Sequence, residues 1–226
     1  MAIDWSRREN APSKIIGVRR NFEAAAPSDH RAVRSPWLYL KPPSAVCGDG
    51  AEIEIPAEGG EMLAEAELAV IVGREARNIT PAQVPDIVRG VIVGNDVTSM
   101  DLFQDCGQLS RAKGLDGFCP LGGEPVPFAA IENGVMLRCF VNGELRQEGN
   151  TNKAVFPLRE TIAYIASWFT LWPGDILLLG TPDKAPPIRI GDEVRVEADG
   201  IGSVTNRLVA KRDTGYVFPP STQSAS

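Results

Sequence analysis

The chain has 226 residues, of which 43% are hydrophobic, so it can bury a core of its own and suits one domain better than two. Its formal net charge is −6 and its Lys and Arg residues form no dense run, so nucleic acid is not an expected partner. The longest apolar runs are strand-sized, far below the roughly twenty residues that span a bilayer, and the start has no apolar signal core, so we expect a cytoplasmic protein without a membrane partner.

Strand patterns dominate the first half of the chain. Residues 52–55 alternate polar and apolar side chains, which is the period of a half-exposed strand. Residues 68–72 are apolar throughout, so this strand is predicted to be covered on both faces. The other segments with a predicted structure are strands at 14–18, 37–40 and 91–93 and an exposed loop or short helix at 21–34.

Helix signals are fewer. Thr80 is a helix-capping residue and Pro81 suits the first helical position, but Pro85 limits any helix there to a short one. Pro157 opens the clearest helix, because apolar residues recur at helical spacing between 158 and 169. Further strands are predicted at 176–179 and 194–197. With no repeated strand–helix–strand rhythm, the pattern favours a mainly β, α+β fold with mixed sheets and few helices.

The predicted organisation is a single domain over residues 14–212. The segments 1–13 and 213–226 lack periodicity and are predicted to be loose ends. Residues 14–44 are a candidate for a small N-terminal lid portion of the domain.

Several kinds of chemistry lack support in the sequence. The four cysteines include no C-x-x-C pair and the chain has one histidine, so neither a zinc site nor a disulfide framework is indicated. We expect the cysteines to be reduced and mostly buried. The chain has no G-x-S-x-G, no phosphate-cradling Gly-rich loop and no G-x-G-x-x-G, which argues against hydrolase triads and nucleotide-dependent enzymes.

Glu65 and Glu67 lie at the entry to the apolar strand and form the first candidate site. Being two residues apart, they project from the same face if the strand is regular. Two like charges roughly 5–7 Å apart at the edge of a core repel each other and are costly to desolvate, and a divalent cation offsets both costs. The alternative is a solvated strand edge, which is what we expect for Glu52 and Glu54.

Three other residues are candidates for chemistry. Asp96 directly follows the strand at 91–93, where side chains commonly line sites, although turn chemistry with Asn95 is an alternative. His30, the single histidine, could act as a general acid or base on a loop, or be a solvated loop residue. For Lys113 the local residues alone predict a surface lysine.

A series of motifs in a fixed order resembles the fumarylacetoacetate hydrolase family from about Lys14 to Arg212. The matching segments are WLYLKP at 37–42, EAELAVIVG at 65–73, GNDVT at 94–98, KGLDGFCPLG at 113–122, VNGELRQ at 141–147, LWPGD at 171–175 and LGTP at 179–182. Within the family, the DGFCP run and the short LGTPDKA ending most resemble the isomerase and decarboxylase of homoprotocatechuate breakdown.

The resemblance implies both a fold and a site. The fold would be the mixed β-sandwich roll of the family's C-terminal domain, usually a homodimer, with substrates that are 2-oxo acids or their enols. Mg²⁺ or Mn²⁺ would be held by Glu65, Glu67 and Asp96, and Lys113 would be catalytic. The residues expected to contact the substrate are Lys41, Phe103, Gly180 and Thr181, the last two through a backbone N–H and a hydroxyl.

Two departures from the family pattern bear on the reaction. In hydrolytic members the motif that corresponds to Asn21-Phe22 is followed by a His and a Glu that activate water, but here Ala25 and Ser28 stand at those positions and His30 is displaced. Where the family often has an Arg and a Gln beyond the third metal ligand, this chain has Met100 and Phe103. Both changes argue against a hydrolytic water.

We therefore expect a divalent-metal-dependent decarboxylase or isomerase, acting on an unsaturated 2-oxo dicarboxylate through a metal-stabilised enolate in aromatic-compound catabolism. One alternative is a carbon–carbon hydrolase of the acylpyruvate or fumarylpyruvate type, with His30 brought in as a base by closure of the loop at 21–34. A second alternative is a protein that binds a metal and an oxo acid without turnover.

Overall fold

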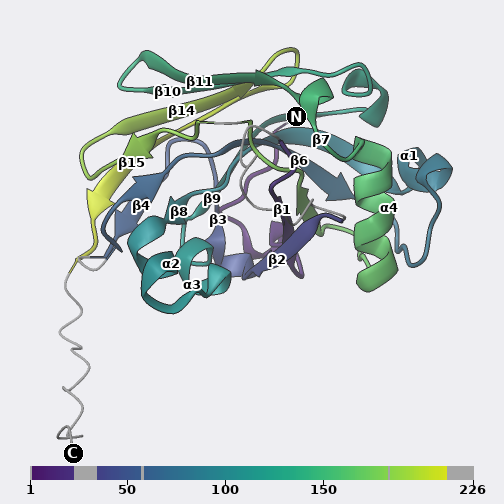
Figure 1. Cartoon of the computed structure of the whole chain (residues 1–226), viewed down its shortest axis with the longest axis horizontal. Helices are drawn as coiled ribbons and strands as arrows, with labels where there is room; N and C mark the ends of the chain where they lie inside the picture. Colours follow the sequence, from purple (N-terminus) through teal and green to yellow (C-terminus); the bar gives the residue numbers. More distant parts are fainter. Residues whose placement is uncertain (1, 23–34, 57–58, 183, 213–226) are drawn as a thin grey trace, which may run out of the picture.

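The computed structural model describes residues 2–22, 35–56, 59–182 and 184–212, and most of its elements are strands (Figure 1). The described strands are β1 (Ile15–Arg19), β2 (Trp37–Lys41), β3 (Val46–Cys47), β4 (Glu52–Ile55), β5 (Met62–Leu63), β6 (Ala66–Val72), β7 (Val88–Asn95), β8 (Thr98–Ser99), β9 (Cys119–Val126), β10 (Met136–Val141), β11 (Glu144–Asn150), β12 (Ile176–Leu178), β13 (Pro187–Ile188), β14 (Glu193–Ala198) and β15 (Gly202–Ala210). The described α-helices are α1 (Val84–Ile87), α2 (Met100–Cys106), α3 (Leu109–Lys113) and α4 (Leu158–Trp168). The expected mainly β fold with few helices is confirmed.

Two large sheets pack face to face. The central sheet has the order β2-β1-β12-β6-β7-β9-β3, and it is mixed because β1 runs parallel to β12 while β6 and β7 run antiparallel. The second sheet has the order β11-β10-β14-β15-β4 and lies over the central sheet in Figure 1. A small sheet of β13, β5 and β8 completes the fold.

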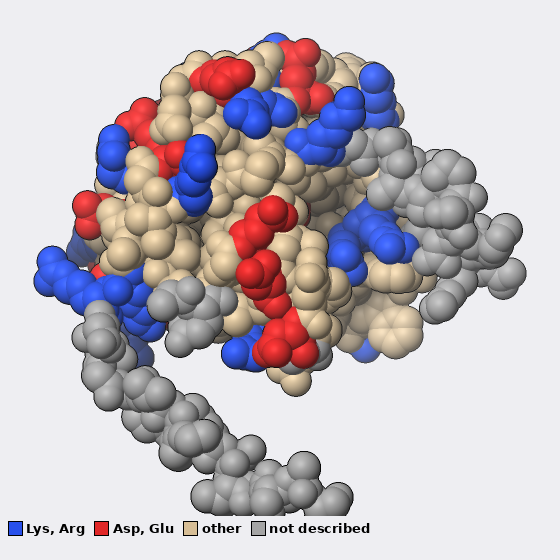
Figure 2. All heavy atoms as spheres, turned by 60° about the vertical axis from the view of Figure 1, so that its left-hand side comes forward, with Lys and Arg blue, Asp and Glu red and all other residues tan. Residues whose placement is uncertain are grey.

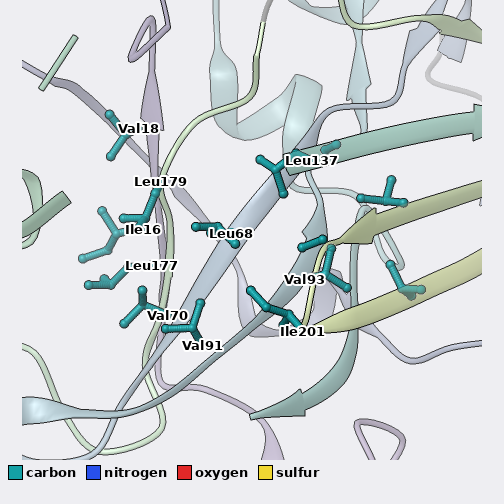
Figure 3. Close-up of a cluster of buried hydrophobic side chains, with 14 of the residues drawn as sticks. Ile16, Val18, Leu68, Val70, Val91, Val93, Leu137, Leu177, Leu179 and Ile201 are labelled. Atoms are coloured by element: carbon teal, nitrogen blue, oxygen red, sulfur yellow. The ribbon is translucent and has the colours of Figure 1, made fainter. Parts of the chain in front are cut away.

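Strand β6 shows how the two faces of the central sheet differ. Its residues are buried throughout, as predicted for a strand covered on both sides. Leu68 and Val70 belong to the first core cluster, which fills the space between the two large sheets and includes Leu137 of β10 (Figure 3). Ala69 and Ile71 point to the opposite face and belong to a second, smaller core cluster. The odd-numbered positions of β6 therefore share the second face.

Helix α4 was predicted from the sequence, whereas α2 and α3 were not. Helix α4 begins after Pro157 as expected and packs Ile162 and Ile165 into the first core cluster. Helix α2 was not predicted, although its ends carry ordinary signals. The Ser99 hydroxyl accepts the Leu102 N–H at 3.2 Å, and Gly107 ends the helix with a positive φ of 67°. Among the described residues, no helix is both long and apolar enough to cross a bilayer.

Both expectations about the N-terminal region need correction. Residues 2–13 are not loose, because Ile3 and Trp5 pack against the second core cluster. The described parts of 14–44 do not form a separate lid, because β1 and β2 are strands of the central sheet. The segments 23–34 and 213–226 lie outside the described residues.

On the surface, acidic and basic side chains are interspersed over the face drawn in Figure 2.

Candidate metal centre

Strand register brings three carboxylates together on the second face of the central sheet. Glu67 lies opposite Gly94 in the β6–β7 ladder, and the Asp96 N–H donates to the Glu65 carbonyl at 2.9 Å. Glu65 and Asp96 are thus direct neighbours, and Glu67 is two residues along the same face. One carboxylate oxygen from each of the three lies within 4.8 Å of the other two. Glu65 itself precedes β6 by one residue, so only Glu67 is on the strand.

Asp96 is fully buried and carries the most contacts of the three. One of its carboxylate oxygens accepts from the Lys41 Nζ, and the other accepts from the Tyr39 hydroxyl and the Lys113 Nζ. Burial alone would raise the pKa of Asp96, but the charges and hydrogen bonds of the two lysines hold that pKa below its ordinary value. The lysines therefore favour the ionised form of Asp96.

Glu67 has a different environment. It is also buried, and its Oε2 accepts the Gly180 N–H at 2.7 Å. Burial, reinforced by the charges of Asp96 and Glu65, raises the pKa of Glu67 well above its ordinary value. Glu67 is thus the carboxylate that would gain most from an added positive charge.

Lys113 lies at the end of α3 and faces the cluster. Its Nζ donates to Glu65 Oε2 at 3.0 Å, to the Thr98 hydroxyl at 2.5 Å and to Asp96. Only 3% of the residue is exposed, so the surface lysine predicted from the local residues is wrong and the position implied by the family resemblance is the one observed. Burial alone would lower its pKa, but Asp96 and Glu65 raise the pKa of Lys113 above its ordinary value, so the ammonium keeps its proton.

The donor set fits a hard divalent cation. Three carboxylates face two ammonium groups, those of Lys41 and Lys113, which leaves one net negative charge when all are ionised. All the available ligand atoms are oxygens, which Mg²⁺ and Mn²⁺ prefer to thiols or imidazoles. A dication would reverse the sign of the cluster, leaving it able to attract an anionic substrate.

Tyr39 and Gly17 form a pair that the sequence did not assign to the site. They are directly opposite each other in the β1–β2 ladder. A Cβ atom on Gly17 would lie 2.0 Å from Cζ of the tyrosine ring, so the missing side chain is what lets the ring cross β1 and reach Asp96. The signal available in the sequence was the two-residue period of β2, which puts Tyr39 and Lys41 on one face.

A cavity of about 300 Å³ opens from the carboxylate cluster. Glu65, Lys113 and Thr98 lie at its wall, and α2 contributes Met100 and Phe103. The remaining residues that line it are Val18, Arg19, Arg20, Phe22, Tyr39, Leu63, Leu109, Thr181, Pro182, Lys184 and Ala185. Near the cluster the cavity wall carries both a carboxylate and an ammonium group. Beside α2 the wall is partly apolar, and at the end of β1 it is basic.

Of the residues expected to contact the substrate, some line the cavity and others do not. Phe103 and Thr181 line the cavity. The Gly180 N–H is already donated to Glu67, so it supports a candidate ligand and is not available to a substrate carboxylate. Lys41 is fully buried behind Asp96, and its Nζ also donates to the Phe118 carbonyl at 2.5 Å, so it positions the carboxylate and does not reach the cavity. His30 lies outside the described residues.

Gln147 connects three parts of the site and was also missed as a functional residue. Its side-chain amide donates to the Thr181 hydroxyl at 3.0 Å and to the Pro182 carbonyl at 2.6 Å, and accepts from the Ala66 N–H at 3.3 Å. A single amide of β11 thus fixes the 180–182 loop against the start of β6, between the two glutamates.

Comparisons with known proteins give a consistent picture. The family described as fumarylacetoacetate (FAA) hydrolase C-terminal matches residues 14–209. Protein Rv2993c of Mycobacterium tuberculosis is 36% identical over 204 residues, which cover 88% of this chain and 76% of that protein. The 4-hydroxyphenylacetate degradation bifunctional isomerase/decarboxylase of Escherichia coli is 37% identical over 190 residues, or 83% of this chain and 44% of that protein. A crystal structure of 5-carboxymethyl-2-hydroxymuconate delta-isomerase from Mycobacterium smegmatis aligns with a TM-score of 0.82 at 36% identity, covering 89% of this chain and 78% of that one.

Proposed function

The chain belongs to the fumarylacetoacetate hydrolase family, and from that premise we propose that it is a divalent-metal-dependent enzyme that decarboxylates or isomerises an unsaturated 2-oxo dicarboxylate. The observation that supports this most is the cluster of Glu65, Glu67 and Asp96, with Lys113 against it, which borders a substrate-sized cavity through Glu65 and Lys113. The ion we propose is Mg²⁺ or Mn²⁺.

Two similar proteins support this choice of reaction. The E. coli relative is named an isomerase/decarboxylase of 4-hydroxyphenylacetate degradation, and the M. smegmatis structure is named a muconate delta-isomerase. Neither isomerisation nor decarboxylation consumes a water molecule, which agrees with the Met100 and Phe103 side chains beside the site. We propose a role in the breakdown of aromatic compounds on the same grounds, and a homodimer on the family resemblance, to be tested by light scattering after size exclusion.

The residues of the chain would divide the work as follows. Glu65, Glu67 and Asp96 would hold the cation, which when bound supplies a Lewis acid for the carboxylate and 2-oxo oxygens of the substrate. Lys113 keeps its proton because two carboxylates lie against it, so it acts as a hydrogen-bond donor and fixed positive charge where negative charge develops. Lys41 and Tyr39 hold Asp96 in place from behind.

The experiment is a substrate panel with purified protein and Mg²⁺: oxaloacetate, an acylpyruvate and a homoprotocatechuate-derived dienoate. We expect decarboxylation or isomerisation that EDTA abolishes, that Glu67→Gln and Lys113→Met each lower by at least about 100-fold, and that the exposed control Lys211→Met leaves unchanged.

Two results would overturn the proposal. Rapid acylpyruvate cleavage that collapses in His30→Ala would make the enzyme a carbon–carbon hydrolase with a base from the 21–34 loop. Tight binding of Mg²⁺ and oxalate without turnover of any substrate in the panel would favour a binding protein.

A further inference from the structure

Arg19 occupies a distinctive place in the cavity. It is the last residue of β1, and the two-residue period that points Gly17 toward Tyr39 also points Arg19 to the second face of the sheet. The side chain is half-buried and lines the cavity together with Phe103 and Met100 of α2. Neither the fold nor the metal cluster described above uses its positive charge.

The guanidinium of Arg19 has no acidic partner among the described residues. The buried Asp96 is paired with lysines, and the surface residues Arg138 and Arg159 each form an ion pair, whereas Arg19 stacks on an aromatic ring. Its Cζ lies 4.9 Å from the centroid of Phe103. Burial and then the charge of Arg20 lower the pKa of Arg19, and the smaller effect of the Glu65 charge raises it.

Stacking leaves the hydrogen-bonding edge of the guanidinium available. A ring on one face holds the planar group in position while its N–H donors, which lie in the plane, stay free to bind a carboxylate through two parallel bonds. Glu65 is near enough to influence the charge of Arg19 but forms no ion pair with it. Arg19 therefore lies apart from the metal ligands but within the same cavity.

We infer that Arg19 binds the second carboxylate of a 2-oxo dicarboxylate whose oxo-acid end lies at Glu65, Glu67 and Asp96, and that it is the residue by which the enzyme selects diacids over monoacids. The inference rests on the proposed function, because it takes the oxo-acid end to be bound at the carboxylate cluster. Phe103 has two roles in it, holding the guanidinium and contacting the carbon chain of the substrate.

Two other cations of the cavity are weaker candidates. Arg20 stacks on Trp37, with its Cζ 4.6 Å from the ring centroid, and has a further partner of its own. Lys184 is exposed, so water already solvates its ammonium and a new ion pair there gains little. A half-buried guanidinium without an acid is the better-prepared receptor.

The test compares ligands that differ in one group. In the presence of Mg²⁺, calorimetry measures the affinity of 2-oxoadipate against 2-oxohexanoate, which has the same number of carbons and a methyl in place of the second carboxylate. Oxalate serves as a probe of the chelating end alone. For the wild type we expect the diacid to bind roughly 10- to 100-fold more tightly than the monoacid, the range for a charged hydrogen-bonded pair.

The variants assign that preference to a residue. Arg19→Gln should remove the preference while leaving the affinities for 2-oxohexanoate and oxalate within about twofold, and Arg19→Lys should restore part of it. Arg20→Gln and Lys184→Gln are the matched controls and should keep the preference. Unchanged oxalate binding also shows that each variant is folded.

The outcomes separate this inference from the proposed function. If the wild type binds Mg²⁺ and oxalate but has no preference for the diacid, or if the preference survives Arg19→Gln or disappears in either control, the role of Arg19 is refuted and the metal site stands. If the wild type binds no oxalate even with Mg²⁺, the proposed function fails, and the inference fails with it.

Discussion

Glu67 and Asp96 belong to one cluster, but their charges have opposite effects on the fold. Because burial and two neighbouring carboxylates raise the pKa of Glu67, its ionised form costs stability when no cation is present. Glu67→Gln keeps an oxygen that can accept the Gly180 N–H and removes the charge. We expect this variant to match or exceed the wild type in melting temperature in EDTA and to lose the stabilisation that Mg²⁺ gives the wild type.

Differential scanning fluorimetry with and without Mg²⁺ measures both effects. Glu52→Gln is the matched control, because Glu52 is an exposed residue of β4 and should not respond to the metal. A variant at Glu67 that lost stability in EDTA, or that was still stabilised by Mg²⁺ as strongly as the wild type, would contradict the proposal that Glu67 binds the cation and that its charge destabilises the metal-free fold.

Asp96→Asn should have the opposite effect. The carboxylate is what compensates the buried ammonium groups of Lys41 and Lys113, so removing its charge leaves two buried cations short of a partner. Breaking a buried ion pair by deleting one partner costs about 3–5 kcal/mol, and we expect a loss of that order in the free energy of unfolding by urea. A loss below about 1 kcal/mol in the free energy of unfolding would mean that water solvates the two ammonium groups when the Asp96 charge is absent.

Burial also determines how one cysteine reacts. Cys139 is fully buried, and burial raises the pKa of its thiol to about 12. A raised acid pKa means that the neutral thiol persists, and the neutral form is not a nucleophile. Iodoacetamide at pH 8 should leave Cys139 unmodified in the folded protein and label it after unfolding, as read by mass spectrometry. Rapid labelling of the native protein would show that β10 opens locally.

The residues of the carboxylate cluster show how far single residues could be predicted. The spacing of Glu65 and Glu67 was enough to place both carboxylates on one face. Lys113 shows the limit, because the five-residue helix α3 is too short to carry a periodic pattern, and its burial depends on Asp96, seventeen positions away in the chain and on another element. Only the order of motifs, not local chemistry, pointed to it.

At the scale of the element, the β1–β2 ladder controls the geometry of the site. A methyl carbon added at Gly17 would lie 2.0 Å from Cζ of Tyr39, so the ring must leave its place beside Asp96. We expect Gly17→Ala to weaken Mg²⁺ binding by at least about tenfold and to lower stability by about 1–3 kcal/mol, the usual cost of overpacking.

Calorimetric titration with Mg²⁺ and urea unfolding test this prediction. The double variant Gly17→Ala, Tyr39→Phe separates the effect of the clash with the ring from the effect of losing the Tyr39 hydroxyl. In the double variant, removing only the hydroxyl should not relieve the clash between the ring and the new methyl group, so the Mg²⁺ affinity should stay low. Tyr39→Phe alone loses one hydrogen bond to Asp96 and should keep most of the Mg²⁺ affinity. A Gly17→Ala protein with normal Mg²⁺ affinity would show that the ring position does not matter.

The positions of the strands were easier to predict than the pairing between strands. The alternation at β4 and the unbroken apolar run of β6 are local patterns, and both were read correctly from the sequence. The parallel pairing of Ile15 with Ile176 was not predictable, because nothing local selects one apolar strand from several others. Helix α2 was missed because its seven residues include few that recur at helical spacing, although Ser99 and Gly107 mark its ends.

At the scale of the whole molecule, one core joins the layers. The first core cluster contains side chains from the central sheet, the five-stranded sheet and α4, as Figure 3 shows for Leu68 and Leu137. Neither sheet can unfold alone without exposing the apolar face of the other. The three clustered carboxylates stand on the opposite face of the same central strands, so the site should disappear in the same transition.

Leu137→Ala tests this cooperativity. Leu137 lies on β10, is fully buried and belongs to the first core cluster, on the face of the central sheet opposite the carboxylates. Deleting its side chain should cost about 2–5 kcal/mol, whereas the control Leu145→Ala, on an exposed residue of β11, should stay within about 0.5 kcal/mol. Circular dichroism, tryptophan fluorescence and loss of Mg²⁺ binding should report a single shared midpoint in urea for the wild type and for each variant. If Leu137→Ala instead separated an early loss of the five-stranded sheet from a later loss of Mg²⁺ binding, the sheets would be independent units, because a shared core cannot release one face and keep the other.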